Sequence, residues 1–589
     1  MLATAEPPPP FLEKKADPPN ALDARVHAGL ARAFFSISPT SLTLALTDWG
    51  IQLTLSPGKR LELMQFAIDQ WLRLHCYCCA IARSSSTLST PECVIPPSFD
   101  KRFSAADWHK WPFSVFHQAF LLADEWWHKA TTNTLGVTAH HEHIVHFITR
   151  QWLDVFSPGN FLLTNPLVLR RTSETWGRNL VRGAIHIIED IERSVTQQPN
   201  PNASTYQVGQ NIAITPGKVI LRNRLMELIQ YAPATPDVHP EPVLIMPAWI
   251  MKYYILDLSP HNSLIRYLVD QGFSVFCISW KNPGWAERDL DIDDYLDLGF
   301  FAALKAIQAV TGQHKIHATG YCLGGTLLAI AAATMARDGD SRLHTITLFT
   351  AQTDFRESGE LALFIDENEV SLLEAQMNET GYLTAGQMAG AFQMLRSNDL
   401  MWSRMINEYL MGERAKYNDL MTWNADATRM PARMHGRYLR ELFLNNALSE
   451  SRYKIKGEPI TLFNITTPIF CVATRADHVA PWGSVYKLHY LTPAEVTFVL
   501  TTGGHNAGIV NSPERTDRTY QCLTRPRGGH YLSHKHWLAT APHRSGSWWP
   551  SWSAWLQERS GSRVAPPPLG HPGDYPCIDE APGRYVHER

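Results

Sequence analysis

A cysteine between glycines is the residue of this sequence best suited to covalent chemistry. The motif Gly320-Tyr321-Cys322-Leu323-Gly324-Gly325 follows an apolar, strand-like run and precedes an Ala- and Leu-rich segment of helical character. A nucleophile elbow needs this context, because a tight strand-to-helix turn requires close backbone approach at its glycines. The helix start would favour a thiolate on Cys322. The short motif alone fits a buried, inert cysteine equally well, so the interpretation depends on partners elsewhere in the chain.

Those partners follow in the order that an α/β-hydrolase triad requires, which is nucleophile, then acid, then histidine. Asp477 comes at the end of a strand-like run, 468–476, just before a proline turn. His505 lies in a glycine-rich loop after the run 496–501. We predict that His505 takes the thiol proton of Cys322, and that Asp477 holds the tautomer of His505 or acts on a second substrate.

Two backbone N–H groups are predicted to bind the oxyanion of the tetrahedral intermediate. One belongs to Leu323, directly after the nucleophile, and the other to Ile250, in the loop after the first catalytic strand. His478, next to the predicted acid, is an alternative member of the site, although we expect it to pack or hydrogen-bond beside Asp477.

Two other groups of potential ligands do not have the spacing of a metal site. In the stretch 140–146 (HHEHIVH), the zinc-protease pattern H-E-x-x-H would need a histidine where Val145 stands. A second ligand pair at usable spacing is missing for a cluster of three cysteines, Cys76, Cys78 and Cys79. We therefore expect no metal.

The elements that must position the triad follow from an alternation of short apolar runs with helical segments. This alternation indicates βαβ units and a mostly parallel sheet. The predicted strands are 243–249, 274–280, 315–321, 345–350, 468–474 and 496–501. The segment 354–448 is helical in pattern and too long for a connection, so we predict an inserted cap over the active site. The tryptophan-dense stretch 546–556 is predicted to be a final packing helix.

The whole chain is predicted to be an α/β protein with an α/β-hydrolase fold, preceded by a mostly helical N-terminal domain. A proline-rich, disordered tail is expected at 1–25, the helical domain at 26–200 and the catalytic domain at 201–589. A formal charge of -3 gives no basic face for nucleic acid. No run approaches the roughly 18 apolar residues of a membrane span, and the N-terminus has no signal-peptide core. We expect a cytoplasmic protein whose nine cysteines form no disulfide framework.

Several motifs resemble those of the polyhydroxyalkanoate (PHA) synthases, particularly the single-subunit, class I-like kind. The resemblance runs over nearly the whole chain. Beside the elbow it includes 252–258 (KYYILDL), 279–283 (SWKNP), 423–428 (WNADAT), 438–440 (YLR), 477–482 (DHVAPW) and 504–505 (GH). In the N-terminal part it includes 112–113, 126–127, 160–161 and 164–166.

The resemblance implies that (R)-3-hydroxyacyl-CoA is polymerised into polyester with release of CoA. Cys322 would carry the acyl chain as a thioester, His505 would activate the thiol, and Asp477 would help to deprotonate the attacking 3-hydroxyl. No metal or redox cofactor is implied. A thioester keeps the acyl group activated, which suits transfer from a CoA donor to a hydroxyl. The resemblance also implies a homodimer at the surface of polyester granules, with the N-terminal domain assisting either contact.

The sequence departs from the common pattern of that family at Met251, where many members have Asn, and in the histidine loop 503–508. These departures leave the predicted triad intact. The alternative function is a thioesterase or intracellular polyester hydrolase that uses the same triad with water as acceptor, because the fold does not fix the acceptor. A non-catalytic granule-coating protein is a third reading, and the intact triad argues against it.

Overall fold

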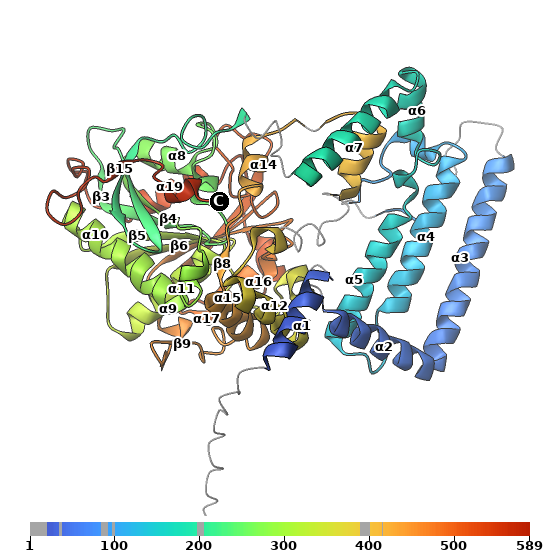
Figure 1. The fold of residues 1–589 in the computed structure, drawn as a ribbon, viewed down its shortest axis with the longest axis horizontal. Helices are drawn as coiled ribbons and strands as arrows, with labels where there is room; N and C mark the ends of the chain where they lie inside the picture. The colour runs from blue at the N-terminus through green and yellow to red at the C-terminus, as the bar shows by residue number, and fades with distance from the viewer. Residues whose placement is uncertain are drawn as a thin grey trace, which may run out of the picture.

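The computed structural model describes residues 20–33, 38–83, 92–96, 100–196, 205–388, 401–414 and 416–589. An N-terminal group of helices lies on one side and a sheet covered by helices on the other, with the cap segment between them (Figure 1). Nothing in the described residues forms a helix both long and apolar enough to cross a membrane.

The N-terminal part is helical, as predicted. Several helices begin at a side-chain cap, for example where Ser38 Oγ accepts from Ser41 N and Pro39 takes the first helical position. Helix α1 begins at Ala21, so the end of the predicted disordered tail (1–25) is helical instead. This helix contacts cap helix α12 (Glu367–Thr380), and the packing favours the helical state. Residues 1–19 lie outside the described part. The helices are α1 (Ala21–Ala33), α2 (Pro39–Leu55), α3 (Pro57–Arg83), α4 (Phe113–Thr131), α5 (Ala139–Val155), α6 (Pro166–Glu174) and α7 (Arg178–Thr196), with short turns η1 (Ala106–His109) and η2 (Pro158–Asn160).

The catalytic part is built on one mixed sheet. Within the described residues eleven strands pair in the order β14-β13-β12-β11-β6-β5-β3-β4-β2-β1-β15. The predicted runs form its parallel centre, which is β3 (His239–Met246), β4 (Phe273–Trp280), β5 (Ile316–Tyr321), β6 (Leu343–Phe349), β11 (Ile469–Thr474) and β12 (Val496–Thr501).

Antiparallel strands extend this sheet at both edges, and the alternation of strands and helices did not predict them. They are β1 (Gly217–Arg222), β2 (Met226–Tyr231), β13 (Thr519–Arg525), β14 (His543–Ser545) and β15 (Asp579–Glu580). The expectation of a mostly parallel sheet is therefore correct only for the centre. An antiparallel pair needs no crossover helix, so these strands lack the βαβ pattern by which the others were found.

Helices cover both faces of the sheet (Figure 1). Residues of α10 (Ala302–Thr311) and α11 (Leu323–Arg337) belong to the apolar core of one face. Residues of α8 (Leu264–Asp270) and α19 (Trp549–Gln557) belong to that of the other. The tryptophan-dense segment thus forms the predicted packing helix. Smaller elements are η4 (Tyr253–Leu256), η5 (Trp285–Glu287), α9 (Ile292–Asp294), η6 (Tyr295–Phe301), β9 (Lys454–Ile455), β10 (Glu458–Pro459), η11 (Leu462–Asn464), α16 (Trp482–Tyr486), α17 (Leu488–Leu491), α18 (His534–Thr540) and η12 (Tyr585–His587).

The predicted cap, 354–448, leaves the sheet after β6 and returns before β11. The described residues of the cap are largely helical, and β7 (Tyr382–Leu383) pairs with β8 (Met430–Pro431) in a two-stranded antiparallel sheet. The elements of the cap are η7 (Gly359–Phe364), α12 (Glu367–Thr380), β7 (Tyr382–Leu383), η9 (Met405–Leu410), α14 (Asp419–Asn424), β8 (Met430–Pro431), α15 (Ala432–Arg437) and η10 (Tyr438–Leu444).

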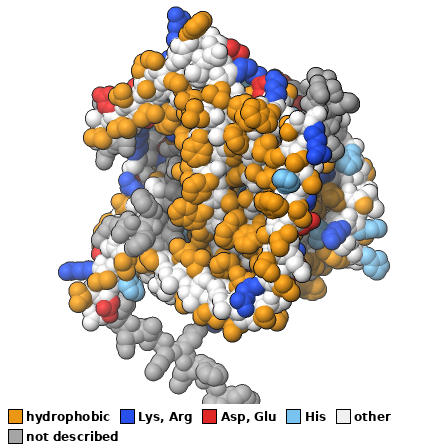
Figure 2. All heavy atoms as spheres, turned by 90° about the vertical axis from the view of Figure 1, so that its right-hand side faces the viewer, with side chains coloured by type: hydrophobic (Ala, Val, Ile, Leu, Met, Phe, Trp, Pro, Cys, Tyr) orange, Lys and Arg blue, Asp and Glu red, His pale blue; other side chains and the backbone are white. Residues whose placement is uncertain are grey.

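An apolar surface lies on the outer side of the N-terminal helices. Figure 2 shows hydrophobic side chains gathered over the end of the molecule that α3 and α4 form in Figure 1. On α3, exposed apolar residues recur at helical spacing and define what we term the α3 apolar face, consisting of Leu61, Met64, Ile68, Trp71 and Leu72. Such a face is unusual on a helix whose outer side meets only water.

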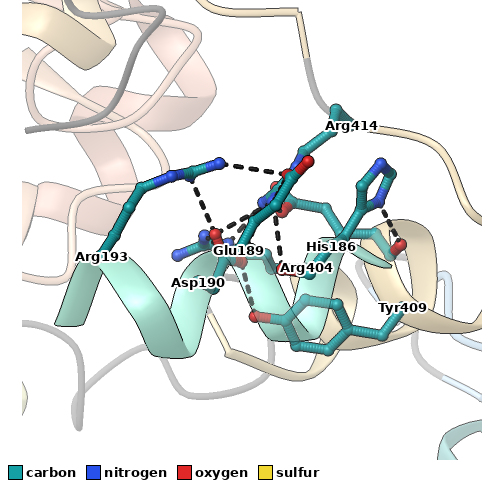
Figure 3. A network of polar contacts seen from close by, with 8 residues as sticks. His186, Glu189, Asp190, Arg193, Arg404, Tyr409 and Arg414 are labelled. Carbon is teal, nitrogen blue, oxygen red and sulfur yellow. Dashed lines mark hydrogen bonds and ion pairs between the residues drawn. The ribbon is translucent and has the colours of Figure 1, made fainter. Parts of the chain in front are cut away.

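Polar side chains of helix α7 form hydrogen bonds and ion pairs with the cap (Figure 3). Asp190 accepts hydrogen bonds from Arg414 at 2.8 and 3.0 Å and from the Tyr409 hydroxyl at 2.9 Å. His186 Nδ1 donates to the Glu408 carbonyl at 2.9 Å. A network of charge-assisted hydrogen bonds therefore joins the N-terminal helices to the segment 401–414 of the cap.

Candidate active site

The nucleophile elbow predicted from the sequence has the backbone of one. Cys322 stands between the last residue of β5 and the first of α11, with φ 52° and ψ −123°. A non-glycine residue in this region costs on the order of 1–3 kcal/mol and persists only where the surrounding structure enforces it. The turn is enforced from both sides, because Cys322 N donates to Phe349 O at 2.8 Å and the Cys322 carbonyl accepts from Gly325 N at 2.9 Å.

The glycines around Cys322 are required by close backbone approach. A Cβ on Gly320 would lie 2.5 Å from the Cα of Gly325, and one on Gly324 would lie 2.2 Å from the Met246 carbonyl oxygen. No side chain fits at these separations. The first turn of α11 can therefore lie directly against the end of β3, and this contact positions the thiol at the carboxyl edge of the sheet.

The predicted acid and base lie at neighbouring strand ends and are hydrogen-bonded. His505 Nδ1 donates to Asp477 Oδ2 at 2.8 Å. The other oxygen, Asp477 Oδ1, accepts from the N–H groups of Val479 and Ala480 at 2.9 and 2.8 Å. Burial raises the pKa of Asp477, but the His505 charge and these hydrogen bonds outweigh it and hold the pKa below its ordinary value.

His505 is electrostatically suited to hold a proton. Burial alone would lower the pKa of His505, but the negative charges of Asp477 and of an ionised Cys322, together with hydrogen bonds to both, raise it well above 6.5. The histidine side chain is 14% exposed, whereas that of Asp477 has no exposed surface. The structure therefore brings Cys322, His505 and Asp477 together in the order of a triad.

The two predicted oxyanion donors lie beside the nucleophile. Leu323 is the first residue of α11, and the first N–H groups of a helix have no intrahelical acceptor. Ile250 lies in the loop after β3, and both residues line the same cavity as Cys322. The cap holds this loop, since Thr428 N donates to Ile250 O at 3.1 Å and Thr428 Oγ1 donates to Trp249 O at 2.7 Å.

A cavity of about 650 Å³ opens at Cys322. Its wall is largely apolar and comes from three parts of the chain. The elbow supplies Leu323, the cap supplies residues such as Tyr438, and the N-terminal helices supply Leu42 and Phe147. A long, weakly polar chain would fit such a wall.

Sequence reasoning missed several members of this wall. Leu42 and Phe147 had no signal beyond helical periodicity. Glu369 and His435 are buried polar residues of the cap that line the cavity, and Nδ1 of His435 makes no hydrogen bond. The pKa of Glu369 is raised to about 8, mainly by burial. Glu369 stands at helical spacing from the apolar residues Leu372 and Leu373, and this spacing is the signal that would have identified it.

The other groups considered from the sequence lie in different settings. His478 is exposed. His141 pairs with Asp48 at 2.7 Å, and His146 Nδ1 lies 3.0 Å from Thr131 Oγ1, so these histidines have separate partners. All nine cysteines are free.

One metal-like group occurs among the described residues, and it consists of Glu92, His109 and His117. Both ring nitrogens of His117 are already used, because Nδ1 donates to Trp108 O at 3.1 Å and Nε2 lies 2.9 Å from Gln118 Nε2. These hydrogen bonds support a structural role for His117 and not that of a metal ligand.

Comparisons with known proteins find related sequences over most of the chain. Residues 99–268 match the family described as "Poly-beta-hydroxybutyrate polymerase (PhaC) N-terminus", residues 17–59 match "Poly-beta-hydroxybutyrate polymerase N terminal", and residues 241–512 match "alpha/beta hydrolase fold". The chain is 42% identical to a poly(3-hydroxyalkanoate) polymerase of Methylorubrum extorquens, over 84% of this chain and 82% of that protein. It is 42% identical to the polymerase subunit PhaC of Rhizobium etli, over 90% and 82% of the two chains, and 35% identical to that of Cupriavidus necator, over 83% of each.

Proposed function

Because this chain belongs to the poly(3-hydroxyalkanoate) polymerase family, we propose that it polymerises (R)-3-hydroxyacyl-CoA on the thiol of Cys322. It is an acyltransferase that joins hydroxyacyl units into polyester. The observation that supports Cys322 most directly is its placement: the residue has the positive φ of a nucleophile elbow and lines an apolar cavity beside His505.

The first step loads the enzyme. His505 takes the proton of Cys322, and the thiolate attacks the thioester carbonyl of the substrate. A carbon–sulfur bond forms to Cys322 and the bond to CoA breaks. The CoA thiolate leaves with the proton that His505 returns to it, so the step consumes no cofactor. The raised pKa of His505 supports this role, since the imidazole must hold the proton while the tetrahedral intermediate exists.

The second step extends the polymer. The 3-hydroxyl of one acyl unit attacks the thioester carbonyl of another, so that an ester bond forms and a thioester bond breaks. His505 accepts the hydroxyl proton and delivers it to the leaving sulfur. Asp477 acts through His505 in this proposal. Its enclosed carboxylate and its 2.8 Å bond to Nδ1 support an orienting role over direct contact with the substrate hydroxyl.

Leu323 and Ile250 are the proposed oxyanion donors in both steps. Their backbone N–H groups would bind the oxygen of the tetrahedral intermediate, where removal of one donor in a comparable hydrolase site costs about 10²–10³-fold in rate. The hydrogen bonds from Thr428 to the carbonyls of Ile250 and Trp249 support a fixed position of the loop after β3. Oxyanion donors in a fixed loop need no reorganisation during the reaction.

The reaction is tested with purified protein and (R)-3-hydroxybutyryl-CoA, with Cys322→Ala alongside. The proposal expects CoA release together with insoluble polyester, and loss of both in the variant. Release of CoA with only free 3-hydroxybutyrate would instead support the alternative, a thioesterase or intracellular polyester hydrolase. No observation in the structure or in the comparisons favours that alternative.

A granule contact is proposed for the α3 apolar face. Its five residues are 47–63% exposed, and no charged residue interrupts the series on that side of the helix. A growing polyester is an apolar phase, so burial of these side chains against it would be favourable by about 25 cal/mol per Å². A homodimer and a cytoplasmic location at the granule surface stay predictions of the family resemblance.

The granule contact is tested by partition onto polyester particles. The double variant Ile68→Gln/Trp71→Gln should partition less strongly than the unaltered chain while it retains its catalytic rate on soluble substrate. A matched control is Leu135→Gln, since Leu135 is 86% exposed but lies outside α3. Equal partition of all three proteins would contradict the proposed contact, and sedimentation analysis of the same samples reports whether the face joins two copies instead.

A further inference from the structure

The residue before the nucleophile and the residue after the catalytic histidine are hydrogen-bonded to each other. The Tyr321 hydroxyl donates to Asn506 Oδ1 at 2.6 Å. Tyr321 is the last residue of β5 and is 2% exposed, and Asn506 directly follows His505. A bond of this length is a normal, well-formed O–H···O hydrogen bond.

The loop that carries His505 is held at its two ends, where Ala476 N donates to Gly503 O at 3.0 Å and Trp548 Nε1 donates to Gly508 O at 2.9 Å, but neither bond joins it to the nucleophile elbow. It contains Gly503, whose φ is 112°, together with Gly504 and Gly508, so its backbone is intrinsically permissive. Asp477 holds the imidazole at one point, Nδ1. This hydrogen bond sets the tautomer but does not fix the imidazole relative to the elbow. The Tyr321–Asn506 bond attaches the middle of the loop to the end of β5, directly before Cys322.

The geometry also places the tyrosine ring against the imidazole. The ring centroids of Tyr321 and His505 are 5.8 Å apart, with the planes tilted by 40°. The ring of Tyr321 packs against the imidazole and limits its tilt. The hydroxyl of Tyr321 binds Asn506 and limits the movement of the loop that carries His505. Asn506 Nδ2 also lies 3.5 Å from Asn424 Oδ1 at the end of α14, which extends the contact to the cap.

We propose that Tyr321 and Asn506 are positioning residues that fix the distance between His505 and Cys322. This inference rests on the proposed function of that cysteine and histidine. Proton transfer depends steeply on this distance, and displacement of a catalytic group by about 1 Å can cost roughly 10²-fold in rate. The hydroxyl of Tyr321 is therefore required for rate, whereas its ring is required for packing.

The test separates the hydroxyl from the ring. Tyr321→Phe keeps the ring and removes the donor, and Asn506→Leu removes the acceptor at similar volume. Each should lower kcat for CoA release by about 10–100-fold with KM nearly unchanged. Asn506→Asp keeps an acceptor for the Tyr321 hydroxyl, so its kcat should lie much closer to that of the unaltered chain than the kcat of Asn506→Leu. Tyr267→Phe is the matched control, since it also loses one tyrosine hydrogen bond, to Ser553 at 2.9 Å, outside the site; it should retain full kcat.

A second readout needs no substrate. The rate of Cys322 alkylation by iodoacetamide, followed against pH, reports the coupling between thiol and imidazole. We expect the profile to change in Tyr321→Phe and Asn506→Leu, with no further change in the double variant, because each removes the same bond. A merely structural role would lower the melting temperature and leave the profile unchanged. Wild-type kcat and profile in Tyr321→Phe, or additive losses in the double variant, would overturn the inference. Failure of the proposed function is distinct, since the unaltered protein would then release CoA without insoluble polyester, or Cys322→Ala would remain active.

Discussion

His505 Nδ1 lies 2.8 Å from Asp477 Oδ2, and the carboxylate of Asp477 has no exposed surface. The remaining oxygen of Asp477 accepts two backbone N–H groups at the end of β11. The carboxylate thus has fixed partners on both sides, and the proton of the imidazole stays on Nδ1. In the proposed mechanism the other ring nitrogen, Nε2, is the base. The arrangement supports an orienting role for Asp477, which the sequence alone left open.

Replacement of Cys322 by alanine should abolish acyl transfer. Without the sulfur no thioester forms, and loss of a nucleophile of this kind lowers turnover by at least about 10³-fold. The measurement is CoA release from (R)-3-hydroxybutyryl-CoA. Cys577→Ala is the control, since Cys577 is also a free cysteine but is exposed and is not among the residues that line the cavity. Activity of Cys322→Ala near that of the control would disprove the assignment.

Asp477→Asn should slow acylation and elongation to a similar extent. The amide cannot stabilise the protonated imidazole, and a loss of about 10²–10⁴-fold is expected from a comparable triad. Pre-steady-state CoA release reports the first acylation, and polymer growth reports elongation. A much larger effect on elongation alone would show that Asp477 acts on the substrate hydroxyl directly, contrary to the enclosed position of its carboxylate.

The site was predictable from sequence where local pattern determines structure. The elbow around Cys322 and the strand ends before Asp477 and His505 each consist of a short apolar run followed by turn residues. Chain order then predicted which of these residues form the proposed triad. These features depend on residues close together in the sequence, so periodicity and residue type are sufficient to find them.

The rest depends on contacts between distant segments. Leu42 reaches the site only because the N-terminal helices and the cap meet there, and no local pattern encodes that meeting. The hydrogen bond of Asn506 to Tyr321 likewise joins two strand ends that are far apart in the sequence. The edge strands β1 and β2 were missed because a hairpin lacks the crossover helix that marked the central strands. Tertiary packing also decides that Glu369 is buried, although a glutamate in a helix is most often exposed.

Gly324→Ala should disrupt the elbow. Its Cβ would lie 2.2 Å from the Met246 carbonyl and 2.5 Å from that of Pro247, and both obstacles are backbone atoms that cannot turn aside. We expect at least about a 10-fold loss of turnover, and a loss of stability of roughly 1–3 kcal/mol. Gly483→Ala is the matched control, because Gly483 lies in helix α16 with nothing within 4 Å of an added Cβ. Thermal unfolding and CoA release of the two variants should diverge, and similar values would contradict the steric argument.

Glu369 should make the stability of the protein fall as the pH rises from about 4.5 to 8. Its carboxyl accepts from Ser38 N at 2.5 Å, at the start of α2, but burial raises its pKa to about 8. The folded state therefore holds a proton that the unfolded chain, with an ordinary pKa near 4.5, has already lost. The contribution of Glu369 to stability is highest below the unfolded pKa and declines until the pH passes the folded one, by on the order of 5 kcal/mol.

Glu369→Gln should remove this decline. The amide stays neutral at every pH and can still accept from Ser38 N. Melting temperatures between pH 5 and 8 should fall less steeply in this variant than in the unaltered chain. Glu514→Gln, a change at an exposed glutamate, is the control and should follow the unaltered chain. Parallel curves for all three proteins would show that Glu369 does not titrate in this window.

Arg414 should be the residue on which the attachment of helix α7 to the cap depends. Its guanidinium donates to Asp190 at 2.8 and 3.0 Å, to Glu408 at 2.5 Å and to Glu189 at 3.1 Å (Figure 3). Arg414→Ala would remove the cation that contacts Glu189, Asp190 and Glu408 together. Arg193 would still pair with the two carboxylates of α7, and among the ion pairs of the described residues only the longer contacts of Arg404, 3.4 Å to Asp190 and 3.3 Å to Glu408, would bridge α7 and η9. Since these groups are partly buried, we expect a loss of about 1–3 kcal/mol, below the 3–5 kcal/mol of a fully buried pair.

The consequence should extend to the active site, because Met401 and Trp402 of the same cap segment line the cavity. We expect faster proteolysis within 401–414 and a several-fold rise in KM for the acyl-CoA. Arg193→Ala is the matched control: Arg193 pairs with Asp190 at 2.9 Å and Glu189 at 3.2 Å, but it belongs to α7 and does not bridge to the cap. If both variants were cleaved at the same rate, the bridge from α7 to the cap would not be what holds this segment.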